Sequence, residues 1–187
     1  MTTATLIAVI LAIVAIAIAA WALLRVRRTD RLRTKFGPEY DHVIEREGNR
    51  SRAEAELLKR ESRVKKFNLR PLSTEERARL SDAWTHDQSL FVDDPRKALI
   101  DADALVRETM SARGYPMSDF STQMADVSVD HASVIENYRQ AHQIAELCRT
   151  GRADTEDMRR GMIHYRALFE ELLGTSAPDR QPEEVTR

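Results

Sequence analysis

The hydrophobic pattern divides the chain into one unbroken apolar run near its start and shorter amphipathic stretches after it. The run covers residues 6–24 and contains no charged side chain. At about 1.5 Å per residue this stretch forms a helix of roughly 28 Å, close to a hydrocarbon core of about 30 Å. A helix also satisfies its own backbone hydrogen bonds inside lipid. The pattern therefore predicts a membrane-spanning helix that contacts the bilayer through residues 6–24.

Beyond the run, apolar residues recur at spacings of three and four, which is typical of helices. Between residues 36 and 72 they are sparse among many charges, and we expect a solvated stalk helix from Pro38 to about Lys66, weakened in its middle by Gly48. The alternative is a helix that binds a partner or self-associates, against which stands the absence of three continuous apolar heptads. Strand-like alternation is confined to residues 127–129, which is too short for a sheet. The sequence predicts an all-α chain.

Residues 73–174 are expected to form a compact bundle of about four helices. Ser73 and Glu76 have the spacing of a capping box, and Asp94 precedes Pro95 as an N-cap precedes a first-turn proline. Further N-caps are expected at Ser118 or Asp119, at Asp130, and at Asp154 or Thr155. Two of the expected helices carry an apolar stripe on one face, formed by Ala98, Leu99, Ala102, Leu105, Val106 and Met110 in the second and by Met158, Met162, Tyr165, Phe169 and Leu172 in the last. The last two helices should pack antiparallel. Residues 175–187 have almost no apolar side chains and are predicted to be a disordered tail.

A basic flank directly after the apolar run predicts the orientation of the anchor, residues 1–35. Its members are Arg25, Arg27, Arg28, Arg31, Arg33 and Lys35. Because basic residues beside a first span stay on the cytoplasmic side, we expect the N-terminus outside and the C-terminal domain inside a bacterial cytoplasmic membrane. The same flank should contact anionic lipid headgroups.

Two alternatives to this orientation stay open. Small residues at positions 17–19 are compatible with a cleaved signal peptide, although the basic cluster follows the apolar run rather than preceding it. The second alternative is an extracytoplasmic helical domain that remains anchored in the membrane.

The charge distribution argues against nucleic-acid binding. The chain has a net charge of −1, but residues 25–79 carry 17 basic and 10 acidic side chains, and residues 80–187 carry 12 basic and 20 acidic ones. A net-negative distal region lacks the basic face that follows a phosphate backbone. The single cysteine, Cys148, has no partner for an intramolecular disulfide, and we expect a packed thiol there.

Three histidines are the weak candidates for metal or enzymatic chemistry: His131, His142 and His164. Bundle metal sites typically use Glu-x-x-His pairs, and that spacing occurs here only at Glu39 and His42. The alternative is that the histidines are hydrogen-bonded groups at helix interfaces. No catalytic residue and no cofactor is predicted.

Irregular structure between residues 113 and 131 carries the candidates for partner binding: Tyr115, Met117, Phe120 and Met124. Loops supply binding residues more often than helices do, so these side chains are candidates for a peptide or helix groove. The alternative is that Tyr115 and Phe120 fill a gap between helix pairs. With no catalytic motif in the chain, protein binding by an adaptor or scaffold is the leading hypothesis.

Six phrases of the sequence resemble an uncharacterised family of bacterial single-span or secreted helical proteins. They lie at residues 36–41 (FGPEYD), 45–48 (EREG), 91–95 (FVDDP), 113–116 (RGYP), 126–131 (DVSVDH) and 164–173 (HYRALFEELL). The resemblance implies a helical, membrane-associated or secreted protein. It implies no activity and no catalytic residue.

Overall fold

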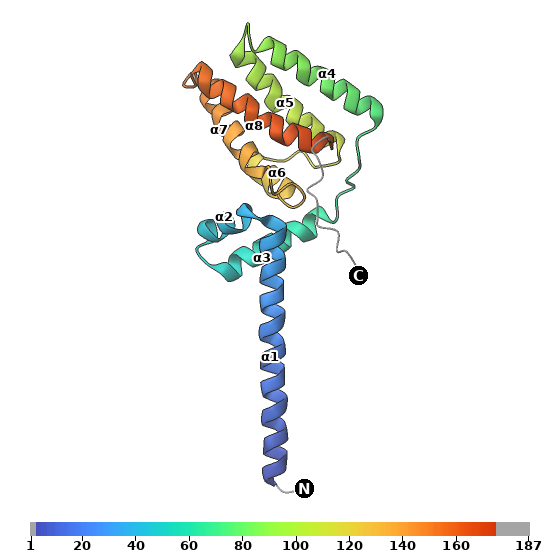
Figure 1. Ribbon diagram of the computed structural model, residues 1–187, viewed down its shortest axis with the longest axis vertical. Helices are drawn as coiled ribbons and strands as arrows, with labels where there is room; N and C mark the ends of the chain where they lie inside the picture. Colours follow the sequence, from blue (N-terminus) through green and yellow to red (C-terminus); the bar gives the residue numbers. More distant parts are fainter. Residues whose placement is uncertain (1–2, 175–187) are drawn as a thin grey trace, which may run out of the picture. The chain divides into compact units, whose positions relative to one another are not determined.

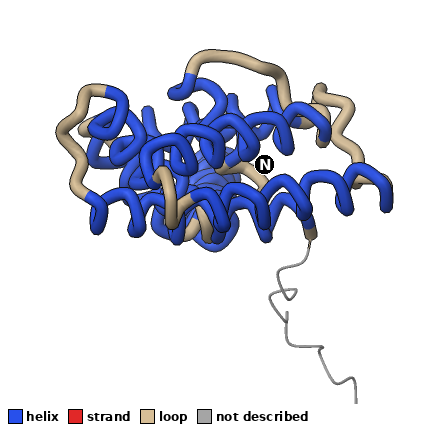
Figure 2. The backbone as a smooth tube through the Cα atoms, turned by 90° about the horizontal axis from the view of Figure 1, so that it is seen from above, coloured by secondary structure: helices blue, strands red, loops and turns tan. Residues whose placement is uncertain are grey.

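The computed structural model describes residues 3–174, and the described chain is entirely helical, as predicted (Figures 1 and 2). Its contacts separate two compact units, residues 1–58 and residues 59–187. The predicted disordered tail, residues 175–187, lies outside the described residues.

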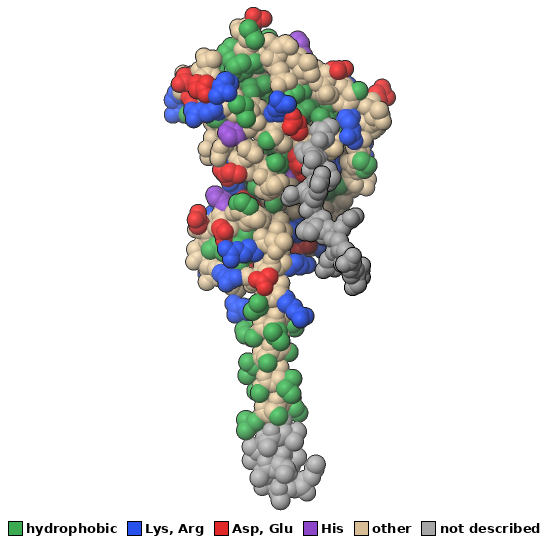
Figure 3. Space-filling view, in the orientation of Figure 1, with side chains coloured by type: hydrophobic (Ala, Val, Ile, Leu, Met, Phe, Trp, Pro, Cys, Tyr) green, Lys and Arg blue, Asp and Glu red, His purple; other side chains and the backbone are tan. Residues whose placement is uncertain are grey.

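The first unit contains a long helix and a helical hairpin. Its helices are α1 (Thr3–Phe36), α2 (Pro38–Glu47) and the first part of α3 (Arg50–Val64). The apolar run and the basic flank belong to the same continuous helix α1 (Figure 1). Within the described residues, Ile10–Phe36 is a helix long and apolar enough to cross a membrane. Green apolar side chains cover this helix up to the blue basic flank in Figure 3.

The predicted solvated stalk helix from Pro38 to Lys66 is wrong, because the segment forms two helices that are partly buried. Gly48 adopts a φ of 63° and its N–H donates to the Ile44 carbonyl at 2.9 Å, which ends α2. The Asn49 side chain then accepts the Ser51 N–H at 2.8 Å as α3 begins. Beyond Val26, the few apolar side chains of this unit are mostly buried. The buried ones are Leu32, Phe36, Tyr40, Val43, Ala53 and Leu57.

The second unit confirms the predicted bundle. It contains four long helices and one short one: α4 (Thr74–Leu90), α5 (Pro95–Ala112), α6 (Phe120–Val127), α7 (Ile135–Arg149) and α8 (Thr155–Leu173). Side-chain N-caps stand at Ser73, Asp94, Asp119 and Asp154, where the sequence placed them. Each cap satisfies backbone N–H groups that a helix start otherwise leaves without partners.

Helix α5 lies at the centre of the bundle and contacts α4, α7 and α8 (Figure 1). Helices α7 and α8 pack along each other in opposite directions, as predicted. Gly161 of α8 allows close packing on both α5 and α7, since a Cβ there would lie 2.8 Å from Leu99 Cδ1 of α5 and 3.2 Å from Ile144 Cγ2 of α7. The predicted apolar stripe of α8 is buried throughout: Met158, Met162, Tyr165, Phe169 and Leu172.

One local expectation is wrong in the connection between α6 and α7. Val127 ends α6 and the next residues form a turn, so the strand-like alternation at residues 127–129 forms no sheet, as expected from its length. Asp130 does not cap α7, which begins at Ile135 without a side-chain cap. Its carboxylate instead accepts the Tyr115 hydroxyl at 3.2 Å. His131 therefore lies in a turn and not on the helix that carries His142.

Candidate functional site

The basic flank predicted to face lipid lies on the C-terminal part of α1. Arg25, Arg27, Arg28 and Arg33 are exposed, and they form no ion pair among the described residues. Arg25 lies over the Trp21 ring, with its guanidinium carbon 5.4 Å from the ring centroid. Lys35 lies similarly over Phe36, at 5.9 Å. Exposed guanidinium groups, those of Arg25, Arg27, Arg28 and Arg33, thus lie next to the exposed apolar part of α1.

The predicted partner-binding residues mostly fill the bundle. Tyr115 is buried, and burial raises the pKa of its hydroxyl. Phe120 stacks on His142 at a centroid distance of 3.6 Å and contacts Tyr138 at 5.0 Å. Met124 packs against the same core. These contacts match the alternative in which the segment fills a gap between helices.

Met117 alone among these four side chains is largely exposed, at 53%. Its sulfur accepts the Gln123 amide at 3.8 Å, so it lies along the start of α6. The four residues therefore form no common groove in the described part of the chain.

His131 is enclosed at the turn after α6. Its Nδ1 lies 3.2 Å from Glu171 Oε1 of α8, and its buried Nε2 has no hydrogen-bond partner in the structure. Burial lowers the pKa of His131, against the opposing effect of Glu171, so the ring favours its neutral form. Through its contact with Glu171, this histidine links the turn after α6 to helix α8.

The other two histidines have separate partners. His142 Nδ1 lies 3.7 Å from Asp103 Oδ1, and the ring is stacked on Phe120. His164 Nδ1 lies 2.9 Å from Asn137 Oδ1 across the α7–α8 pair. The three candidates therefore do not converge. No group of three or more potential metal ligands occurs among residues 3–174.

Asp103 of α5 is the polar centre of the bundle, and the sequence analysis did not single it out. It is 3% exposed, and it accepts the Tyr165 hydroxyl at 2.6 Å and the guanidinium of Arg149. Burial acts to raise the pKa of Asp103, but His142, Tyr165 and Arg149 outweigh it and hold the pKa at about 2. Because the ionised carboxylate accepts hydrogen bonds from side chains of both α7 and α8, it is expected to fix the orientation of these two helices.

One ion pair and one hydrogen bond in the second unit join the end of α3 to the C-terminal end of α6. Arg63 Nε donates to Asp126 Oδ1 at 2.6 Å, and Arg60 Nη1 donates to Ser128 Oγ at 3.3 Å. Burial raises the pKa of Asp126, and Arg63 opposes this shift. The pattern of the sequence offered no signal for these pairs, because the partners are more than 60 residues apart.

Cys148 is a packed thiol, as predicted. Its sulfur lies 3.5 Å from the sulfur of Met158, and the side chain is buried. Burial raises the pKa of the thiol and so disfavours the reactive thiolate.

An open groove with apolar lining lies between α4 and α8. The groove, of about 180 Å³, is lined by Trp84, Gln88, Phe91, Arg159, Met162, Ile163 and Arg166. Trp84 forms a rigid part of it by stacking on Phe169 at 4.9 Å. The side chain of Ile163 is 51% exposed, although isoleucine is among the residue types most often buried. Figure 3 shows exposed hydrophobic side chains interspersed with basic and acidic ones on the bundle.

The size and charge of this groove restrict what it can bind. About 180 Å³ is below the roughly 300–1,000 Å³ of typical small-molecule sites, but it accommodates one or two apolar side chains. Arg159 and Arg166 lie at its edge, each paired with a glutamate on its own helix. An apolar centre with an arginine rim is typical of protein interfaces.

Comparisons of the chain with protein-family models, curated proteins and solved structures found no match. The resemblance noted in the sequence therefore stays a prediction.

Proposed function

We propose that this chain is a single-pass protein of the bacterial cytoplasmic membrane whose cytoplasmic helical domain binds a protein partner. Helix α1 supports the anchor, because it is long and apolar enough to span a bilayer. The basic flank at its C-terminal end supports an N-out, C-in orientation. The domain then acts as an adaptor or scaffold at the membrane surface.

The observation that carries partner binding is the α4–α8 groove. Its exposed Ile163 and its partly buried Phe91 lie beside Trp84, so that an apolar side chain inserted there would be desolvated by aromatic and aliphatic neighbours. The arginines at its edge favour an acidic residue next to that side chain. The expected partner segment is therefore a helix or peptide with an apolar anchor and a neighbouring carboxylate.

Site-specific photo-crosslinking in cells that express the full chain tests this assignment. A photoreactive amino acid at Ile163 should give one discrete protein adduct, because the position lies in the groove. The same amino acid at Val92, which is 85% exposed and does not line the groove, is the control and should give none.

Charge reversal at the edge of the groove provides a second test of the same proposal, with a matched control. Arg159→Glu should reduce the Ile163 adduct at least about fivefold, since a rim charge is expected to act on association. Arg79→Glu changes an arginine of equal exposure that also pairs with a glutamate but lies outside the groove, and it should leave the adduct unchanged. Equal crosslinking from Ile163 and Val92, or equal loss in both charge variants, would contradict the proposal.

A further inference from the structure

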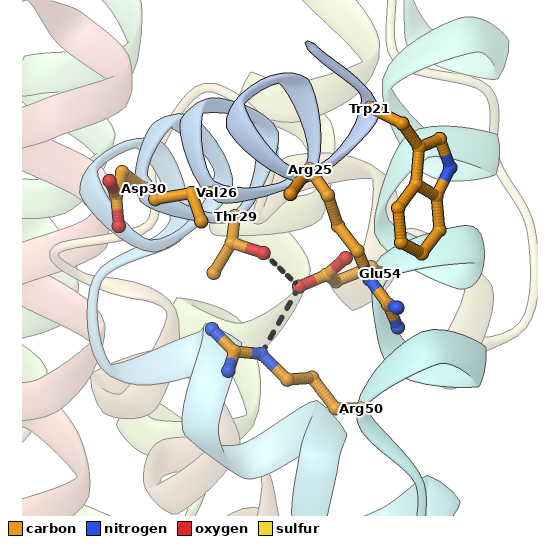
Figure 4. Close-up of a pocket in the computed structure, with 8 residues that line it drawn as sticks. Trp21, Arg25, Val26, Thr29, Asp30, Arg50 and Glu54 are labelled. Atoms are coloured by element: carbon orange, nitrogen blue, oxygen red, sulfur yellow. Dashed lines mark hydrogen bonds and ion pairs between the residues drawn. The ribbon is translucent and has the colours of Figure 1, made fainter. Parts of the chain in front are cut away.

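A cleft in the first unit lies between the end of the apolar part of α1 and the start of α3. It consists of two adjoining cavities of about 450 and 440 Å³ that share Trp21, Arg25 and Glu54. The remaining lining residues are Ala22, Leu24, Val26, Arg28, Thr29, Asp30, Arg50 and Ser51. Figure 4 shows the Trp21 and Arg25 side chains extending from α1 toward Glu54 of α3.

The α3 side of the cleft is held in place by hydrogen bonds around Glu54. Its Oε1 accepts Thr29 Oγ1 at 2.7 Å, the Tyr40 hydroxyl at 3.0 Å and Arg50 Nε at 3.3 Å. Burial acts to raise the pKa of Glu54, but these donors outweigh it and lower the pKa. The carboxylate is therefore ionised, and it fixes α3 against α1 so that the cleft is preformed.

The α1 side of the cleft carries two guanidinium groups that have no carboxylate partner among the described residues, those of Arg25 and Arg28. Guanidinium groups bind phosphate oxygens through paired charge-assisted hydrogen bonds. The charged lining residues are three arginines and two carboxylates, Asp30 and Glu54, so the cleft keeps a net positive charge.

The position of the cleft along α1 points to a lipid. Trp21 is 61% exposed and Leu24 is 66% exposed, and both lie at the end of the apolar run, where indole rings fit the headgroup layer. A ligand in the cleft would therefore place its polar end beside Arg25 and Arg28 and an apolar end along the exposed helix. Free phosphate would use only the first of these two surfaces.

We propose that this cleft binds an anionic phospholipid headgroup that carries hydroxyl groups, such as a phosphoglycerol. Arg25 and Arg28 bind the phosphate, and the carboxylates of Asp30 and Glu54 accept the headgroup hydroxyls. The net charge of the cleft and of the whole flank favours an anionic lipid over a zwitterionic one. This inference rests on the membrane anchor of the proposed function and gives the anchor a specific lipid contact.

The test is a titration of the detergent-solubilised full chain, followed by the fluorescence of Trp21. Trp84→Phe leaves Trp21 as the single indole, since the chain has two tryptophans. The probe is dihexanoyl phosphatidylglycerol. Dihexanoyl phosphatidylcholine, dihexanoyl phosphatidylethanolamine and inorganic phosphate are the comparison ligands, and each should bind at least about tenfold more weakly, a difference of about 1.4 kcal/mol.

Matched arginine pairs distinguish a site from general attraction to the flank. Arg25→Gln with Arg28→Gln should weaken phosphatidylglycerol binding at least about tenfold, because both phosphate contacts are lost. Arg27→Gln with Arg33→Gln removes the same charge from exposed residues that do not line the cleft, and it should change the dissociation constant less than about threefold. Arg28→Gln alone, at an exposed position, provides a variant whose folding is not at risk.

Four outcomes would overturn the inference: equal losses in the two double variants, no loss in Arg28→Gln, equal binding of inorganic phosphate, or tighter binding of a zwitterionic lipid. Failure of the chain to float with lipid vesicles would instead remove the membrane anchor, and with it the proposed function. Flotation together with equal losses would remove only the lipid site.

Discussion

At the scale of single residues, Asp103 connects the central helix α5 to α7 and α8. One buried carboxylate receives groups from α7 and α8, namely Arg149 and the Tyr165 hydroxyl, and His142 lies 3.7 Å away. Removing a buried charge leaves its hydrogen-bond donors without a partner. The resulting loss in the free energy of unfolding exceeds the net stabilisation that the original pair contributed. Asp103 is therefore expected to be sensitive to substitution.

Asp103→Asn should lower the free energy of unfolding by about 2–3 kcal/mol, because hydrogen bonds to a charged acceptor become weaker or are lost. Denaturant titration of the full chain in detergent measures this change, with Trp84 as the reporter in a Trp21→Phe background. Asp101→Asn is the control on the same helix, since Asp101 forms only an exposed pair with Lys97, and it should cost less than about 1 kcal/mol. Equal effects of the two variants would contradict a central role for Asp103.

The acid stability of the bundle should depend on the same residue. The pKa of Asp103 is about 2 in the folded chain against an ordinary value of 3.8, so the unfolded chain binds its proton more tightly. The stabilisation is therefore complete above pH 4 and is lost as the pH falls toward 2, by about 2 kcal/mol. Titrations of the free energy of unfolding between pH 5 and 2 should be steeper for the wild-type chain than for Asp103→Asn. Parallel curves of unfolding free energy against pH for the two chains would rule out this contribution of Asp103 to acid stability.

The residue scale also shows where sequence reasoning ended. Caps such as Ser73 and Asp94 were predictable, because capping depends on neighbours within three residues. Asp103, and the pairing of Arg63 with Asp126, depend on which helices meet, and no local pattern contains that information. The groove around Ile163 was missed for the same reason.

At the scale of elements, the connections control how the helices can pack. Apolar spacing predicted the buried stripes of α5 and α8, because a helix buries the face on which its apolar residues recur. The stalk was predicted incorrectly, since Gly48 was treated as a weak point inside one helix when it ends α2 in a left-handed conformation. Asp130 was predicted as a cap because its bond to Tyr115 is not visible from sequence.

Gly114, at the end of α5, provides a test of one such connection. Its φ is 95°, and a Cβ there would lie 2.4 Å from the backbone oxygen of Asn68. Gly114→Ala should therefore destabilise the bundle through both backbone strain and a clash that only backbone movement relieves. Gly151→Ala isolates the strain, because Gly151 has a φ of 70° but nothing within 4 Å of its Cβ position.

Gly151→Ala should lower the free energy of unfolding by about 1–2 kcal/mol, the typical penalty for a left-handed non-glycine residue. Gly114→Ala should lower it clearly more, because the clash adds to the strain. Thermal unfolding followed by circular dichroism measures both. Equal melting temperatures for the two variants would contradict a close approach of the Asn68 backbone.

At the scale of the whole molecule, the division of the chain into two units corresponds to the two parts of the proposed function. Residues 1–58 carry the apolar helix, its basic flank and the cleft, and residues 59–174 carry the bundle and its groove. A helix long and apolar enough to span lipid was predictable from sequence, because this property depends only on length and polarity. The cleft was not predictable, because it depends on α3 returning to α1.

The central claim is that α1 spans the membrane and keeps the domain that follows it on the cytoplasmic side. Cysteine labelling in intact bacterial cells tests it directly, in a Cys148→Ser background with single cysteines introduced as Thr3→Cys or Asn49→Cys. A membrane-impermeant maleimide should label Thr3→Cys in intact cells and Asn49→Cys only after permeabilisation. Labelling of Asn49→Cys in intact cells would contradict the account.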